Sequence, residues 1–98
     1  MNQAIPPTPV GMIRLMALSK LGIGEEAVVS RLDLPEDVQY HLMHMGFVPE
    51  ARVTALRRAP AGDPTVYAID GLEIALRRDT ADAIRIRQVG DARPVPKS

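Results

Sequence analysis

The sequence contains no cysteine, no tryptophan and a single phenylalanine among its 98 residues. Without cysteine, neither a disulfide framework nor a thiolate metal site can form. No run of about 18 apolar residues occurs that could span a bilayer as a helix. The first seven residues have neither the basic region nor the apolar core of a signal peptide. We therefore expect a cytoplasmic protein.

An excess of one charge is also missing, since Lys+Arg and Asp+Glu number 12 each. This balance argues against a protein whose main role is to bind a polyanion, so we expect no nucleic acid as partner. Ser19 and Ser30 have no histidine near them in the sequence, and the glycines are too scattered for a phosphate-binding loop. We therefore do not expect an enzyme.

The length predicts one domain, and the prolines mark its limits. Residues 1–11 contain three prolines and a glycine without periodicity, which predicts a mobile N-terminal arm. Residues 12–89 carry the apolar patterning of the domain itself. From Gly90 the chain is polar and interrupted by proline, so 90–98 are expected to form a disordered tail.

Short strands make up most of the predicted domain, because β-branched or alternating segments recur between turn residues. We expect strands at 13–17, 25–32, 52–58, 65–69, 72–76 and 84–87. Asp70-Gly71 predicts a two-residue type I′ hairpin, and Asp79 is expected to cap a helical turn near 79–83. Such short strands with one short helix favour a mainly β fold, an SH3-like antiparallel barrel, with an OB-like barrel as the alternative.

One short α-helix is predicted from Pro35 to about Met45. Proline suits the first helical position, and the two acidic residues that follow suit the positive end of the helix dipole. Val38, Leu42 and Met45 are spaced i, i+4 and i+7, which places them in one apolar stripe. We expect this stripe to face the core, with the helix closing one end of the barrel.

The end of this helix is predicted to be a structural anchor formed by Leu42, Gly46 and Phe47. A glycine just past the helix, followed at once by an apolar residue, is typical of a Schellman motif, in which that residue packs back on the last turn. Phe47 is the only phenylalanine, so it should be the largest apolar anchor of the domain. Pro49 then prevents any continuation of the helix.

Three segments resemble the signature blocks of the FeoA family (ferrous iron transport protein A). They are Leu-Met-His-Met-Gly-Phe-Val-Pro at 42–49, Ala-Pro-Ala-Gly-Asp-Pro at 59–64 and Gly-Leu-Glu-Ile-Ala-Leu-Arg-Arg at 71–78. They occur in the family's order and at similar spacing, and the resemblance covers roughly 15–89. It implies an SH3-like cytoplasmic domain that assists or regulates ferrous iron uptake by docking on FeoB, a membrane transporter with a GTP-binding domain. The protein would then reach the membrane only through this partner.

A similar domain ends some iron-dependent repressors, so an iron-linked regulatory or nucleic-acid-binding module is the alternative function. Six arginines on the predicted strands and turns could support it, with Tyr67 as a stacking aromatic. They are Arg57, Arg58, Arg77, Arg78, Arg85 and Arg87. Acidic residues are interleaved with them, so a solvated face of paired charges is the simpler interpretation.

The sequence departs from the family at the corner after the helix. The family usually continues the proline with glycine, whereas here Pro49 is followed by Glu50 and Ala51. Glycine permits a type II turn and glutamate favours type I. The sequence therefore leaves the geometry of this corner open, whereas the expected fold does not depend on it.

Asp37, His41 and His44 lie at i, i+4 and i+7 on one stripe of the predicted helix. Imidazole and carboxylate groups suit iron, nickel or zinc. The alternative is that all three are solvated residues beside the core, since amphipathic helices produce such stripes readily. We expect no required cofactor and at most weak binding of Fe²⁺ or Zn²⁺. One short helix supplies too few ligands, so a metal would be shared between two chains of a homodimer.

The predicted partner-binding residues are Met43, Val48 and Pro49, with Arg77 and Arg78. The first three are apolar groups around the helix end that a small barrel cannot bury completely. The two arginines could steer the protein toward an acidic partner surface. The alternative is that Met43 and Val48 are isolated apolar residues of an ordinary surface.

Overall fold

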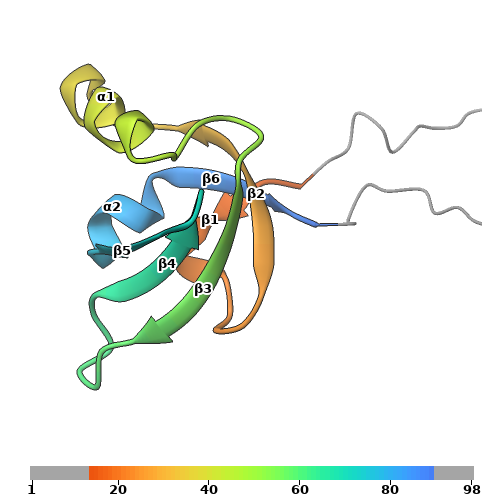
Figure 1. Ribbon diagram of the computed structural model, residues 1–98, viewed down its shortest axis with the longest axis vertical. Helices are drawn as coiled ribbons and strands as arrows, with labels where there is room; N and C mark the ends of the chain where they lie inside the picture. Colours follow the sequence, from red (N-terminus) through yellow and green to blue (C-terminus); the bar gives the residue numbers. More distant parts are fainter. Residues whose placement is uncertain (1–13, 90–98) are drawn as a thin grey trace, which may run out of the picture.

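The computed structural model describes residues 14–89, which form one six-stranded antiparallel sheet with two short α-helices (Figure 1). The elements in chain order are β1 (Met16–Ala17), the 3₁₀ helix η2 (Leu18–Lys20), β2 (Glu26–Leu32), α1 (Glu36–His44), β3 (Arg52–Arg58), β4 (Thr65–Ile69), β5 (Leu72–Leu76), α2 (Arg78–Asp82) and β6 (Ile84–Gln88). The last five strands agree with the predicted ranges to within one residue, whereas β1 is shorter and η2 was not predicted. The predicted arm at 1–11 and tail at 90–98 lie outside the described residues.

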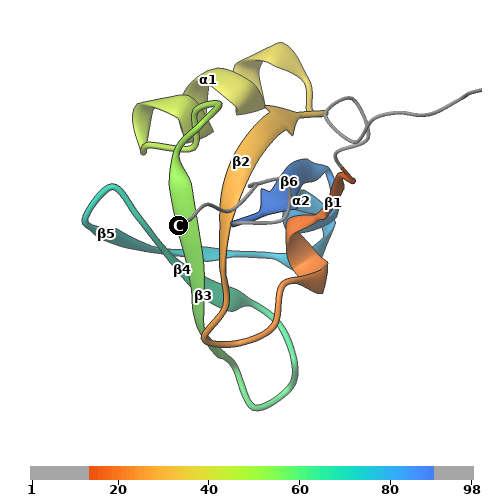
Figure 2. The same ribbon diagram turned by 90° about the vertical axis from the view of Figure 1, so that its right-hand side faces the viewer.

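The strands are hydrogen-bonded in the order β1-β6-β2-β3-β4-β5. The pairing register shifts between Val29 and Arg31 where β2 meets β6, and between Ala55 and Arg57 where β3 meets β4. Bulges of this kind bend a strand and increase its twist. The sheet therefore curls into the predicted small barrel, which Figures 1 and 2 show from two directions.

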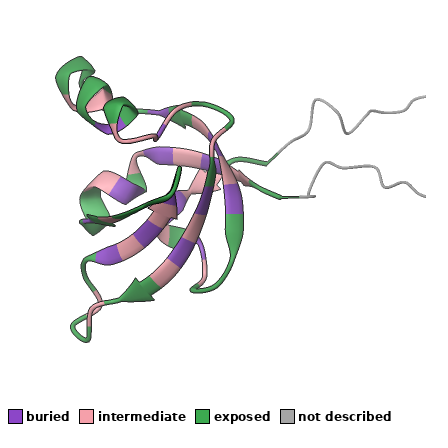
Figure 3. Ribbon diagram, viewed as in Figure 1, coloured by how far each residue is buried: buried purple, intermediate pink, exposed green. Residues whose placement is uncertain are grey.

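Alternate residues of β2, β3, β4 and β6 point into this barrel, so buried positions recur along these ribbons in Figure 3. The largest fully buried side chains are Tyr67, Phe47, Leu18, Leu21, Ile69, Ile84, Ile86, Val29 and Val53. Phe47 is thus a core residue, as predicted, although Tyr67 is the larger side chain.

Helix α1 lies beyond one end of the curled sheet (Figure 1). It begins one residue after the predicted start, with Pro35 as its N-cap residue. Leu42 is its one buried residue. Val38 and Met45 are partly buried and pack against the core. The predicted apolar stripe is confirmed, and it packs the helix against the core of the barrel.

The hairpin between β4 and β5 has the predicted geometry. Asp70 and Gly71 have φ angles of 50° and 79°, so both central residues are left-handed, as a type I′ turn requires. Ile69 pairs with Leu72 directly beneath the turn. The hairpin tip therefore lies at a fixed place, next to the end of α1.

Helix α2 is capped differently from the prediction. Arg77 is its N-cap residue and makes no side-chain cap, while Asp79 lies inside the first turn. Instead, Oδ1 of Asp63 accepts a hydrogen bond of 2.9 Å from the Arg78 backbone N–H. The prediction that Asp79 caps the helix was wrong because the cap comes from the loop before β4, which only the folded sheet brings to this point.

Candidate functional site

The end of α1 is closed by two backbone hydrogen bonds. The Phe47 N–H donates to the Leu42 carbonyl and the Gly46 N–H to the Met43 carbonyl, both at 3.1 Å. Gly46 has a φ of 110°, in the region that favours glycine. This is the Schellman pattern, so the predicted anchor is confirmed. The side chain of Phe47 is fully buried beneath the turn.

Gly46 is also the point of closest approach between the helix end and the β4–β5 hairpin. A Cβ atom at this position would lie 3.0 Å from the Cβ of Asp70, closer than real Cβ atoms normally pack. Glycine is thus required here for space as well as for its φ angle. The φ angle could be predicted from the glycine after the helix, whereas the approach to Asp70 could not, because Asp70 is distant in the sequence.

The corner after Phe47 is a type II turn. Its closing bond runs from the Ala51 N–H to the Val48 carbonyl at 3.0 Å, Pro49 is its second residue, and Glu50 has a φ of 77°. Glutamate by itself favours type I, so the structure decides a geometry that the sequence left open. Glutamate occupies a left-handed position that normally costs an ordinary residue about 1–3 kcal/mol.

Long-range contacts impose this conformation on Glu50. Its N–H donates to the Val29 carbonyl, and the Val29 N–H donates to the Ala51 carbonyl, each at 2.8 Å. The Arg87 guanidinium holds the Glu50 carboxylate with two hydrogen bonds of 2.8 and 3.3 Å. These bonds lower the pKa of the Glu50 carboxyl below its ordinary value. The corner is therefore fixed to β2 and β6 rather than free to move.

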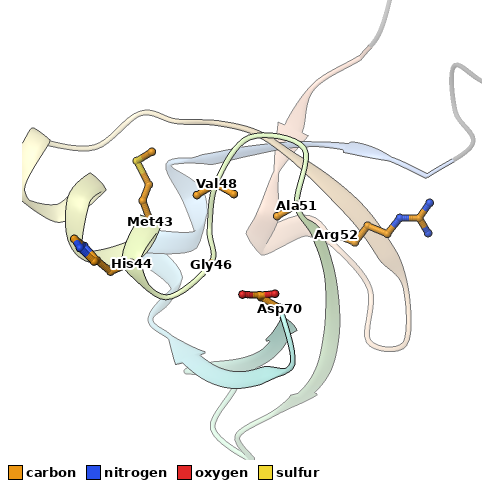
Figure 4. A pocket seen from close by; sticks show the side chains of 7 residues that line it. All are labelled: Met43, His44, Gly46, Val48, Ala51, Arg52 and Asp70. Carbon is orange, nitrogen blue, oxygen red and sulfur yellow. The ribbon is translucent and has the colours of Figure 1, made fainter.

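A pocket of about 440 Å³ opens between the end of α1, the corner, the start of β3 and the hairpin tip (Figure 4). Its lining residues are Met43, His44, Gly46, Val48, Ala51, Arg52 and Asp70. Met43 is 36% exposed and Val48 is half-buried. The structure thus brings together two of the predicted partner-binding residues, while Pro49 is exposed beside them on the corner.

A shallower depression of about 160 Å³ adjoins the pocket and shares Met43 and His44 with it. Tyr40 forms its outer wall and is 62% exposed. Leu72, next to the hairpin tip, is 50% exposed. Three of the six exposed large hydrophobic side chains within residues 14–89 thus lie at this end of the molecule. Such a group of exposed apolar side chains is typical of a contact surface.

Arg77 and Arg78 lie elsewhere. They follow the five residues of β5, whereas the hairpin tip that borders the pocket precedes them. Five extended residues span about 17 Å, so the arginines are at the far end of this strand. Both are exposed, and a role in partner binding stays a prediction for a separate part of the surface.

The predicted metal residues Asp37, His41 and His44 are all exposed on α1. Within residues 14–89, no group of three or more His, Cys, Asp or Glu side chains is placed to hold an ion. The reason is geometric, since seven helical residues rise about 10 Å and metal–ligand bonds are about 2 Å. His44 Nδ1 lies 2.8 Å from the Tyr40 carbonyl. Weak binding of Fe²⁺ or Zn²⁺ stays a prediction.

Three of the six arginines of the alternative nucleic-acid surface form ion pairs within the described residues. Ion pairs join Arg57 to Glu73, Arg85 to Asp33 and Arg87 to Glu50. Tyr67 is 1% exposed, so its ring cannot stack on a base. This part of the surface is the mixed-charge face that the sequence predicted.

No helix among residues 14–89 is both long and apolar enough to cross a membrane.

Comparison with known proteins shows one family. The family model of the FeoA domain matches residues 16–88. A protein from Porphyromonas gingivalis described as an Fe(2+) transport protein A/Fe(2+) transporter FeoB fusion protein is 32% identical over 74 residues. The match covers 76% of this chain and 9% of that relative, so this chain spans only a small part of its length.

Solved structures agree with this match. The FeoA protein of Chlorobium tepidum superposes with a TM-score of 0.73 at 32% identity, covering 83% of this chain and 81% of that one. The FeoA of Stenotrophomonas maltophilia, described as an SH3 domain protein and solved with zinc, gives a TM-score of 0.64 at 28% identity, covering 78% of this chain and 93% of that one. The fold is therefore the predicted SH3-like barrel and not the OB-like alternative.

Proposed function

Since this chain belongs to the FeoA family, we propose that it is a non-enzymatic cytoplasmic protein that regulates ferrous iron uptake by docking on a FeoB-type membrane transporter with a GTP-binding domain. The observation that carries the proposal is the Porphyromonas gingivalis relative, in which a similar domain and FeoB are parts of one fusion protein. Fusion holds two domains at a high effective concentration. A separate chain needs a binding surface to achieve the same association.

The pocket end of the molecule supplies such a surface. Met43, Tyr40 and Leu72 are apolar and exposed there, and the half-buried Val48 lines the pocket. Apolar groups surrounded by polar ones are the usual energetic centre of an interface. The Schellman turn and the fixed corner hold this surface rigid, which lowers the entropy lost on binding.

The side chains of the pocket also support a binding role rather than catalysis. Its seven lining residues include no hydroxyl, thiol or primary amine that could serve as a nucleophile. His44 is hydrogen-bonded to a backbone carbonyl of its own helix. What remains is an apolar wall with a few charged groups, which is suited to recognition.

Co-purification with the FeoB-type transporter of the same organism tests the proposal. The wild-type chain should be retained by the transporter in at least one nucleotide state, and Met43→Glu/Val48→Glu should not be retained. Leu15→Glu/Ile23→Glu is the matched control, because these side chains are 39% and 45% exposed and lie outside the pocket.

Failure of the wild type to bind under every nucleotide and Fe²⁺ condition would refute docking. Equal retention of both double variants would show that the transporter is the partner and that this surface is not the contact.

A further inference from the structure

Among the residues that the structure describes, the Asp70 carboxylate at the hairpin tip has no counter-ion. The ion pairs within residues 14–89 engage Asp33, Glu26, Glu73 and Glu50, and none of them engages Asp70. Figure 4 shows its carboxylate in the space below the Gly46 turn, where it borders the pocket. The type I′ turn and the close packing against Gly46 hold the residue in this place.

The electrostatic field at this point favours a cation. The C-terminal end of α1 also borders the pocket, and it carries the negative end of the helix dipole. Arg52 and His44 are the basic residues among the lining residues, and the His44 imidazole is hydrogen-bonded to the Tyr40 carbonyl of its own helix. In Figure 4 the Arg52 guanidinium extends away from Asp70, and it lies 3.6 Å from Glu26. The charge of Asp70 is therefore open to a partner.

The walls of the pocket suit the stem of a long side chain. Val48 and Ala51 contribute apolar surface to the lining of the pocket that the Asp70 carboxylate borders, and Met43, whose side chain extends away from Asp70 in Figure 4, lines its outer part. Lysine and arginine combine an aliphatic stem with a charged end, and such side chains bury the stem while the charge finds a polar partner. A pocket of about 440 Å³ is ample for one such group.

The surface around the pocket is larger than a single side chain would cover. The adjoining depression at Tyr40 shares Met43 and His44 with the pocket, so the two form one continuous surface. A polypeptide segment can cover both, with a basic residue in the pocket and an apolar residue against Tyr40.

We propose that this pocket receives a lysine or arginine of the transporter segment on which the protein docks, with Asp70 as its counter-ion and Val48 and Ala51 against its stem. The inference rests on the proposed function and names the chemistry of its contact. It predicts that the docking segment of the transporter is basic at the point of contact, and that salt weakens the complex.

Asp70→Asn tests the inference with little effect on the fold. Asparagine has nearly the same shape and is favoured in a type I′ turn before glycine, so only the charge is lost. The dissociation constant of the complex with the full transporter in detergent should rise about tenfold or more. The loss should shrink as the salt concentration increases. Asp79→Asn is the control, since it removes one exposed carboxylate from α2, away from the pocket.

The outcomes separate the two proposals. If the wild type does not bind the transporter, the proposed function is overturned and this inference with it. If the wild type binds and Asp70→Asn weakens binding no more than Asp79→Asn does, the inference alone is overturned. Self-association in analytical ultracentrifugation that Asp70→Asn abolishes, with transporter binding unchanged, would identify a second copy of this chain as the occupant and overturn it as well.

Discussion

Replacing Gly46 by alanine should destabilise the protein through two separate effects. The first is backbone strain, because a φ of 110° is left-handed and costs an ordinary residue about 1–2 kcal/mol. The second is steric, because the new Cβ would lie 3.0 Å from the Asp70 Cβ. Relieving such an overlap in a packed region typically costs about 1–3 kcal/mol. We therefore expect the free energy of unfolding to fall by about 2–5 kcal/mol.

Gly71→Ala separates the two effects. Gly71 has a φ of 79°, and a Cβ there would meet no atom within 4 Å. Its substitution should therefore cost only the strain, about 1–2 kcal/mol. Urea unfolding of the wild type and both variants, followed by circular dichroism, measures the difference. Gly46→Ala should be the less stable of the two.

A double variant identifies the atom responsible. Asp70→Gly removes the Cβ that the new methyl group would meet, so in this background the excess cost of Gly46→Ala over Gly71→Ala should disappear. Equal destabilisation by the two alanine substitutions in the wild-type background would refute the reasoning. It would mean that the hairpin tip moves aside freely and that the helix end and the hairpin are not packed tightly together.

Three further predictions concern the same end of the molecule. Phe47→Ala should lower the free energy of unfolding by about 3–5 kcal/mol, because the ring is fully buried, and an unchanged urea midpoint would contradict this. The Arg87 pair lowers the pKa of Glu50 in the folded state, so its stabilising effect is present above the ordinary value of 4.5 and is lost as the pH falls through the lowered one. Thermal melting of the wild type and Glu50→Gln should accordingly differ at neutral pH and converge in acid, whereas a difference independent of pH would disprove the role of the pair. Calorimetry with Fe²⁺ or Zn²⁺ should give weak binding that His41→Ala/His44→Ala reduces, and tight stoichiometric binding that survives this change would place the metal site elsewhere.

Local chemistry was sufficient to predict most of the elements. Asp70-Gly71 forms a type I′ turn because both residues tolerate a positive φ, and the strands on either side then pair in one register. Gly46 ends α1 because the residue that follows it is apolar and can pack back on the helix. In each case the residues that decide the structure are neighbours in the sequence.

The features that the sequence left open or predicted wrongly concern residues whose partners are distant in the sequence. Glu50 by itself favours a type I corner, but bonds from Val29 and Arg87 stabilise the left-handed conformation. Asp79 was predicted to cap α2, but the Asp63 carboxylate accepts the hydrogen bond from the Arg78 N–H at the start of this helix. A single residue's propensity is worth about 1 kcal/mol or less, so two or three such bonds can outweigh it.

The candidate site shows the same division. Met43 and Val48 follow one another around a helix end, so their proximity could be inferred from the sequence. That Asp70 and Arg52 line the same pocket could not be inferred, because the positions of these two residues depend on the order and register of the sheet strands. The sequence by itself determined the turns, the strands and the apolar anchor, since these follow from short-range preferences. The tertiary structure alone decided which charge faces the pocket, because a curled sheet brings together residues that no spacing in the chain relates.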